Sequence, residues 1–270
     1  MSLPEPRKST APYFYKYSSP AHLEWLRDIL LKHELYMPNL RELNDNNDGL
    51  PHLAIPSAED MAAYLCDNMQ RYRPDLSADQ IPYETEVIRY NVQLHGPAKL
   101  MPIMVKDLDE QLQSHKIYSM TKRYDRMNLW ALYAANHTGY CLEFQNTGDF
   151  FSCAKDVTYL EPKEMEIRLD DPLLTRGDFF FCKTNDWSNE DEVRVVQSRR
   201  DPNNRVRINP NCLTRIIIGK DMKPEHEEQI REWAEHREPQ LEVVNAYYDA
   251  ASRSIKLKEM GDRLHASATA

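Results

Sequence analysis

Hydrophobic positions recur along this chain with two periods, one typical of strands and one typical of helices. Aromatic residues crowd residues 13–17, as in a strand, whereas leucine and isoleucine recur at helical spacing over residues 23–30 after a capping serine, Ser18 or Ser19. The N-terminal part is therefore predicted to contain, in order, a strand at 13–17, a helix ending near 32–33, a short strand at 34–37 and a turn-rich loop at 38–45.

The section from about residue 56 to residue 115 has a different pattern, with helical spacing throughout. Residues 57–60 resemble a capping box, and two further helical patterns cover 84–94 and 98–112. We interpret this section as a helical insertion. A stripe of apolar side chains on its last helix is expected to belong to its core: Met101, Met104, Val105 and Leu108.

The remaining chain returns to strand patterns separated by helices. Strands are predicted at 117–121, 140–144, 157–160, 192–196, 213–219, 241–248 and 254–257, and helices at 130–137, 173–184 and 221–235. The order predicts an α+β protein with a mixed, mostly antiparallel sheet. We expect one domain at 12–260 containing the insertion, a disordered N-terminal tail at 1–11 and a flexible C-terminal tail at 261–270.

Composition narrows the class of protein. The chain has 270 residues and a net charge of -9, which argues against a surface devoted to non-specific nucleic-acid binding, although a local basic groove stays open. Its 5 cysteines show no paired metal spacing and are interpreted as reduced thiols of a cytoplasmic protein. Neither a signal peptide nor an apolar run long enough to span a membrane is apparent, so no membrane partner is expected.

The segment at residues 187–196 carries the strongest candidate chemistry. On a strand, Glu190, Glu192 and Arg194 share one face and the valines between them face the core. Two carboxylates this close raise at least one pKa unless a cation such as Arg194 or Lys183 intervenes. A solvent-exposed edge strand with a Glu–Arg pair explains the same pattern without any chemistry.

A second candidate is the segment Trp130, Tyr133, His137, whose members lie at i, i+3 and i+7 and so share one face of a predicted helix that Gly139 ends. These rings could form a stacking wall. A histidine at this position is more often a partner of the helix dipole at the C-terminus than a catalyst.

Taken together, these segments resemble a bacterial family of unknown function over roughly residues 13–220. Two residues depart from the family pattern, since Asn46 stands where a proline often follows Asn-Asp and Met120 where an aromatic residue is usual. The resemblance rests on Tyr15, Lys16, Tyr17, Asn44, Asp45, Ser119, Trp130, Tyr133, His137, Gly139, Lys183, Trp187, Glu190, Glu192, Arg194 and residues 217–219.

In the order of its elements the chain is also similar, more distantly, to ADP-ribosyltransferase-like folds. This resemblance implies that NAD is a substrate, that Glu192 stabilises the ribosyl cation and that Glu190 polarises or selects the nucleophile. It also implies that the acceptor is a nucleic acid or a protein and that the protein acts as a toxin or phage-defence effector. No metal cofactor is expected. The implied NAD-binding residues are Tyr15, Lys16, Tyr17, Ser119, Trp130, Tyr133, His137, Lys183 and Arg194.

Three alternatives remain open from the residues themselves. The same face could bind a nucleotide or nucleic acid without catalysis. A metal-dependent nuclease or hydrolase could use Asp186, Glu190, Glu192 and His137, although no specific metal spacing is present. An ion-paired, fully satisfied face would instead indicate a structural or partner-binding protein.

Overall fold

The computed structural model describes residues 4–39, 42, 52–167, 177–198 and 204–258. The chain divides into two compact units. The first, here called the helical unit, comprises Met1–Glu5, Asn39–His115 and Thr158–Asn185. The second, here called the sheet unit, comprises Pro6–Pro38, Lys116–Val157 and Asp186–Ala270.

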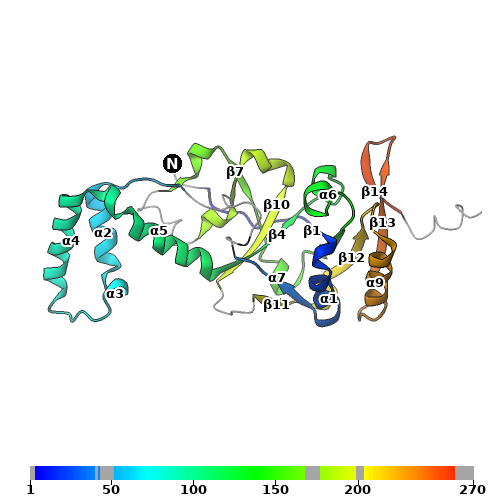
Figure 1. Cartoon of the computed structure of the whole chain (residues 1–270), viewed down its shortest axis with the longest axis horizontal. Coiled ribbons are helices and arrows are strands. Elements are labelled where there is room, and N and C mark those ends of the chain that lie inside the picture. Colours follow the sequence, from blue (N-terminus) through cyan, green and yellow to red (C-terminus); the bar gives the residue numbers. More distant parts are fainter. Residues whose placement is uncertain (1–3, 40–41, 43–51, 168–176, 199–203, 259–270) are drawn as a thin grey trace, which may run out of the picture. The chain divides into compact units, whose positions relative to one another are not determined.

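An eight-stranded sheet forms the centre of the sheet unit, with the order β14-β13-β12-β5-β1-β4-β10-β6 (Figure 1). Its strands are β1 (Tyr13–Ser18), β4 (His115–Thr121), β5 (Tyr140–Gln145), β6 (Lys155–Asp156), β10 (Glu192–Ser198), β12 (Leu213–Ile218), β13 (Glu242–Asp249) and β14 (Ser254–Lys258). β12 and β13 run parallel, whereas β1 is antiparallel to both β4 and β5. The prediction of an α+β protein with a mixed, mostly antiparallel sheet is confirmed.

Strand alternation gives this sheet two buried faces. Phe14 of β1 belongs to the larger core, under α1 (Leu23–Lys32), α7 (Gly148–Phe151) and α9 (Pro224–Glu235). Tyr15 and Tyr17 belong to a second core on the opposite face, under α6 (Met127–Tyr133). β12 is apolar along most of its length because it contributes to both cores. A short pair, β2 (Glu34–Tyr36) and β11 (Arg205–Arg207), completes the described strands of this unit.

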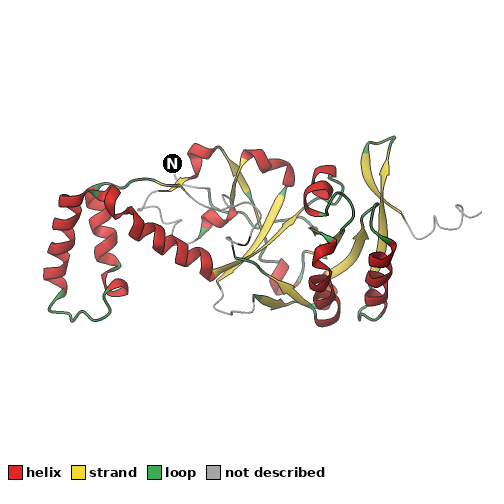
Figure 2. Ribbon diagram, viewed as in Figure 1, coloured by secondary structure: helices red, strands yellow, loops and turns green. Residues whose placement is uncertain are grey.

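Four helices make up most of the helical unit: α2 (Ala58–Asp67), α3 (Met69–Tyr72), α4 (Ile81–His95) and α5 (Pro97–Ser114). Figure 2 shows α2 and α4 lying alongside one another. The predicted helix start is confirmed, since the Ser57 Oγ accepts a hydrogen bond of 3.0 Å from the Asp60 backbone N–H. Met104 and Leu108 are buried as predicted, whereas Val105 is 53% exposed and faces away from the core. Two short parallel pairs join β3 (His52–Leu53) to β8 (Glu166–Ile167) and β7 (Thr158–Leu160) to β9 (Cys182–Thr184).

Two local predictions differ from the structure. The helix predicted at 173–184 is wrong over its described part, because residues 178–181 form a 3-10 turn and 182–184 form β9. Its three consecutive phenylalanines are all buried, and successive residues of an α-helix cannot all face one side. The second concerns the N-terminal tail at 1–11, predicted to be disordered. Ser9 within it is held by a hydrogen bond of 2.9 Å from its backbone N–H to the Ala154 carbonyl.

Candidate functional site

A buried ion pair marks the start of β10. The guanidinium of Arg194 donates from Nε to Glu192 Oε1 at 2.7 Å and from Nη2 to Glu192 Oε2 at 2.9 Å. Arg194 is fully buried and Glu192 is 5% exposed. Bidentate pairing fixes the carboxylate in one orientation. Of the two cations that the sequence offers, Arg194 pairs with Glu192.

Glu190 also lies near this ion pair, but strand alternation, which the sequence predicts, does not place it there. It ends a 3-10 segment, Asn185–Glu190, and is separated from the strand by Asp191 at φ 49°, so strand alternation does not place it. Aspartate tolerates this left-handed conformation because its short side chain bonds locally. The Thr121 Oγ1 donates to the Glu190 carbonyl at 2.6 Å, and the Tyr133 hydroxyl donates to Glu190 Oε1 at 2.5 Å. Contacts with β4 and α6 thus hold Glu190.

Lys16 brings an ammonium group to these carboxylates. Its Nζ donates to the Ser119 carbonyl at 2.8 Å and lies 5.2 Å from the ring centre of Tyr118. Burial lowers the pKa of Lys16 to about 8, helped by the charge of Arg194 and opposed by Glu192 and Glu190. The Ser119 Oγ itself is buried and hydrogen-bonds to no residue that the structure describes. The pKa of Lys16 therefore lies closer to neutrality than that of an exposed lysine.

The two tyrosines that flank Lys16 hold the segment between β4 and α6. The Tyr17 hydroxyl donates to the Arg123 carbonyl at 3.0 Å, and the Tyr15 ring packs 5.4 Å from the ring of Tyr124. Burial, with the adjacent Glu143 carboxylate, raises the pKa of Tyr15 well above its usual value. Both tyrosines are buried, so their present contacts are with the protein itself.

Of the three rings predicted to share a helical face, two stack on each other, but not through a continuous helix. α6 ends at Tyr133, and Ala135, Asn136 and His137 all have positive φ, so His137 does not continue the helical face. The ring of His137 nevertheless stacks on that of Trp130, with 6.0 Å between centres and 8° between planes. Burial lowers the pKa of His137, and the charge of Lys220 adds to this effect. Trp130 is fully buried, so its ring is part of the second core.

A close approach of backbones explains the turn that follows α6. A Cβ added to Gly139 would lie 2.1 Å from the Ser18 carbonyl oxygen, a distance that no side chain can accept. Only glycine allows β1 and this turn to approach so closely. The turn places His137 where its carbonyl accepts a hydrogen bond of 3.1 Å from the Asp221 N–H.

Lys183 belongs to the helical unit, whereas every other predicted site residue belongs to the sheet unit. It is buried on β9, in register with Tyr159 of β7. Asn44 and Asp45 lie outside the described residues.

One buried carboxylate on this sheet face was not singled out from the sequence. Glu143 of β5 accepts hydrogen bonds from the Tyr15 hydroxyl at 3.1 Å and from Thr214 Oγ1 at 2.9 Å, and Arg215 lies 3.6 Å away. The signal that could have identified it is a carboxylate inside an otherwise apolar strand at 140–144. It orients Tyr15 from the side opposite to β4.

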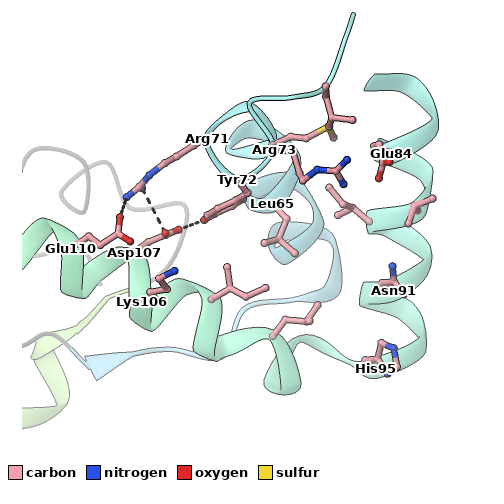
Figure 3. A pocket seen from close by; sticks show the side chains of 16 residues that line it. Leu65, Arg71, Tyr72, Arg73, Glu84, Asn91, His95, Lys106, Asp107 and Glu110 are labelled. Carbon is pink, nitrogen blue, oxygen red and sulfur yellow. Dashed lines mark hydrogen bonds and ion pairs between the residues drawn. The ribbon is translucent and has the colours of Figure 1, made fainter. Parts of the chain in front are cut away.

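A cavity of about 800 Å³ lies elsewhere, between the helices of the helical unit (Figure 3), and none of the predicted site residues lines it. The carboxylate, ammonium and guanidinium groups that could do chemistry belong instead to the sheet unit, and we therefore place the candidate site there. Over the residues described, no group of three or more His, Cys, Asp or Glu side chains is arranged to hold a metal ion. Within those same segments, no helix is long and apolar enough to cross a membrane.

The site therefore combines two carboxylates, an ion-paired guanidinium and a tyrosine hydroxyl, with the Lys16 ammonium group within electrostatic reach of the carboxylates. Such a set can stabilise a developing positive charge, bind a phosphate and move a proton. Comparison of the chain with family models, curated proteins and solved structures finds no match.

Proposed function

We propose that the sheet face around Glu192 is the active site of an NAD-consuming, ADP-ribosyltransferase-like enzyme. The observation that supports this most is the Glu192 carboxylate, which Arg194 holds by two hydrogen bonds next to Lys16 and Glu190. NAD presents a ribose that becomes positive during cleavage and a pyrophosphate that is negative. A fixed anion beside cations matches both charges.

The chemistry assigned to these groups is simple. The bond between the nicotinamide nitrogen and the ribose C1′ breaks, and nicotinamide leaves with the bonding electron pair. The ribosyl cation that remains is stabilised by Glu192, which acts more strongly on this cation than on neutral substrate. An acceptor nucleophile then bonds to C1′ and gives its proton to Glu190, which Tyr133 orients. Lys16 binds the pyrophosphate.

The order of elements supports the same proposal by analogy. In ADP-ribosyltransferase-like folds an aromatic first strand precedes a helix, a middle strand carries a Ser or Tyr near the nicotinamide, and a late strand carries the catalytic Glu. β1, α1, Ser119 of β4 and Glu192 of β10 occur in this order. Because fold analogy does not establish activity, the proposal depends on the site. A protein or nucleic-acid acceptor and a role as a toxin or phage-defence effector belong to the same proposal.

The test is to incubate the purified protein with NAD and to assay free nicotinamide. Wild type is expected to release it, and Glu190→Gln and Glu192→Gln are each expected to reduce the rate by on the order of 100-fold. Asp28→Asn is the matched control, because Asp28 on α1 is also paired with an arginine, Arg205, but packs beside the other core. Equal loss in Asp28→Asn would show that any broken ion pair disables the protein.

A second candidate function is nucleotide binding without catalysis. It is favoured by the fact that both oxygens of Glu192 already bond Arg194 in a buried pair. Calorimetric titration with NAD separates the two functions. Saturable binding that survives Glu192→Gln, with no nicotinamide released, would establish a binding module. If the titration gives no heat and no nicotinamide is released, NAD is rejected as the ligand.

A further inference from the structure

Helix α4 carries apolar residues on two different faces, and only one of them is packed. Ile88 and Val92 lie in the core of the helical unit. On the neighbouring face, Tyr83 is 72% exposed, Tyr90 64% and Leu94 60%. Large exposed apolar side chains gathered on one helix mark an interaction surface.

The exposed face has the spacing of a helix-pairing seam. Tyr83, Val87, Tyr90 and Leu94 follow one another at intervals of four, three and four residues. This is the heptad spacing with which one helix packs its side chains between those of another. The four residues are called the α4 seam below.

A groove lies beside the seam. The cavity of about 800 Å³ is bounded by α2, α3, α4 and α5, with apolar walls that include Leu65, Ile88 and Leu100. Figure 3 shows Arg71 directed at Glu110 and Asp107, and Tyr72 directed at Asp107, at one end of this groove. Val87 belongs to both the seam and the groove wall, so the two surfaces are continuous.

We propose that the α4 seam forms a two-fold interface between two copies of this chain, with the two α4 helices antiparallel. A seam whose apolar residues are spaced symmetrically about its centre can pair with itself, as a two-fold interface requires. In this arrangement Tyr83 lies opposite Leu94 of the second copy, and Val87 lies opposite Tyr90.

The charges beside the seam favour this arrangement. Glu84 then lies opposite Asn91 of the second copy, and Glu86 opposite Gln93, so each carboxylate faces an amide and like charges do not meet. Antiparallel packing also sets the two helix dipoles head to tail, which lowers their repulsion.

Sedimentation equilibrium of the full chain tests the interface. Wild type is expected to have twice the chain mass of 31.7 kDa. Tyr90→Glu, which places two charges at the centre of the seam, is expected to raise the dissociation constant at least about 100-fold. Tyr248→Glu on β13 is the matched control, because this exposed tyrosine is outside the seam, and it is expected to leave the dissociation constant unchanged. A monomeric wild type, or an undisturbed dimer in Tyr90→Glu, would overturn the proposal.

Oxidative cross-linking tests the orientation. In a Cys153→Ser background, which removes an exposed thiol, the double variant Tyr83→Cys/Leu94→Cys is expected to form a covalent dimer. Each single variant is expected to remain uncross-linked, because each new thiol faces an unmodified side chain. Cross-linking of the single variants would indicate parallel helices and contradict the proposed arrangement.

Discussion

The buried pair of Glu192 and Arg194 makes a quantitative prediction about stability. Arg194 is fully buried and Glu192 nearly so, and two hydrogen bonds of 2.7 and 2.9 Å join them. Removing one partner leaves the other charge buried without these two hydrogen bonds. Arg194→Met and Glu192→Gln should therefore each lower the free energy of unfolding by about 3 to 5 kcal/mol. The double variant Glu192→Gln/Arg194→Met removes both charges of the pair and should be less destabilised than the sum of the two, by at least about 2 kcal/mol.

Urea unfolding followed by tryptophan fluorescence measures this coupling. All 4 tryptophans lie in the sheet unit, so the signal reports on the unit that contains the pair. Linear extrapolation gives the free energy of unfolding, and an unchanged slope shows that each variant unfolds from a comparable native state.

An internal comparison is available in the helical unit. Arg73 and Asp75 are also two residues apart and form the same bidentate contact, with both side chains exposed. The corresponding cycle there, followed by circular dichroism, should show little coupling, because water screens exposed pairs. A coupling at Glu192 and Arg194 as small as the one at Arg73 and Asp75 would refute the reasoning.

Two further predictions concern the surroundings of the pair. Because burial lowers the pKa of Lys16 from its ordinary 10.5 to about 8, the unfolded chain holds the extra proton between these values, and stability should rise with pH across this window. Lys16→Met should lack this rise, and below pH 8 its free energy of unfolding should exceed that of wild type by roughly 3 kcal/mol. Urea unfolding at a series of pH values measures both profiles. Parallel profiles for the two proteins would contradict the prediction. Gly139→Ala should lower the free energy of unfolding by about 3 kcal/mol, because its methyl group would overlap the Ser18 carbonyl, and a change within about 0.5 kcal/mol would mean that the turn can relax.

Local pattern was sufficient for most of the secondary structure. The aromatic run at 13–17 forms β1, the residues at helical spacing after Ser19 form α1, and the apolar run at 213–219 forms β12. The Ser57 cap and the helices α2, α4 and α5 also follow the prediction. These features depend on residues close together in the sequence, whose periodicity and capping act within a few positions. The predicted helix at 173–184 is wrong where it is described, because burial of three successive phenylalanines overrides local preference.

The candidate site could be predicted as a set of residues but not as an arrangement. The sequence by itself marked Glu190, Glu192 and Arg194, because period two places strand neighbours on one face, and this holds for the ion pair. Only the tertiary structure joins Lys16 to Ser119 and Tyr133 to Glu190. Those contacts depend on the strand order that sets β4 between β1 and β10, and on a left-handed Asp191 that turns the chain before the strand. Periodicity specifies the direction in which a side chain points, whereas its neighbours are decided by which distant strands pair and by the burial that this pairing achieves.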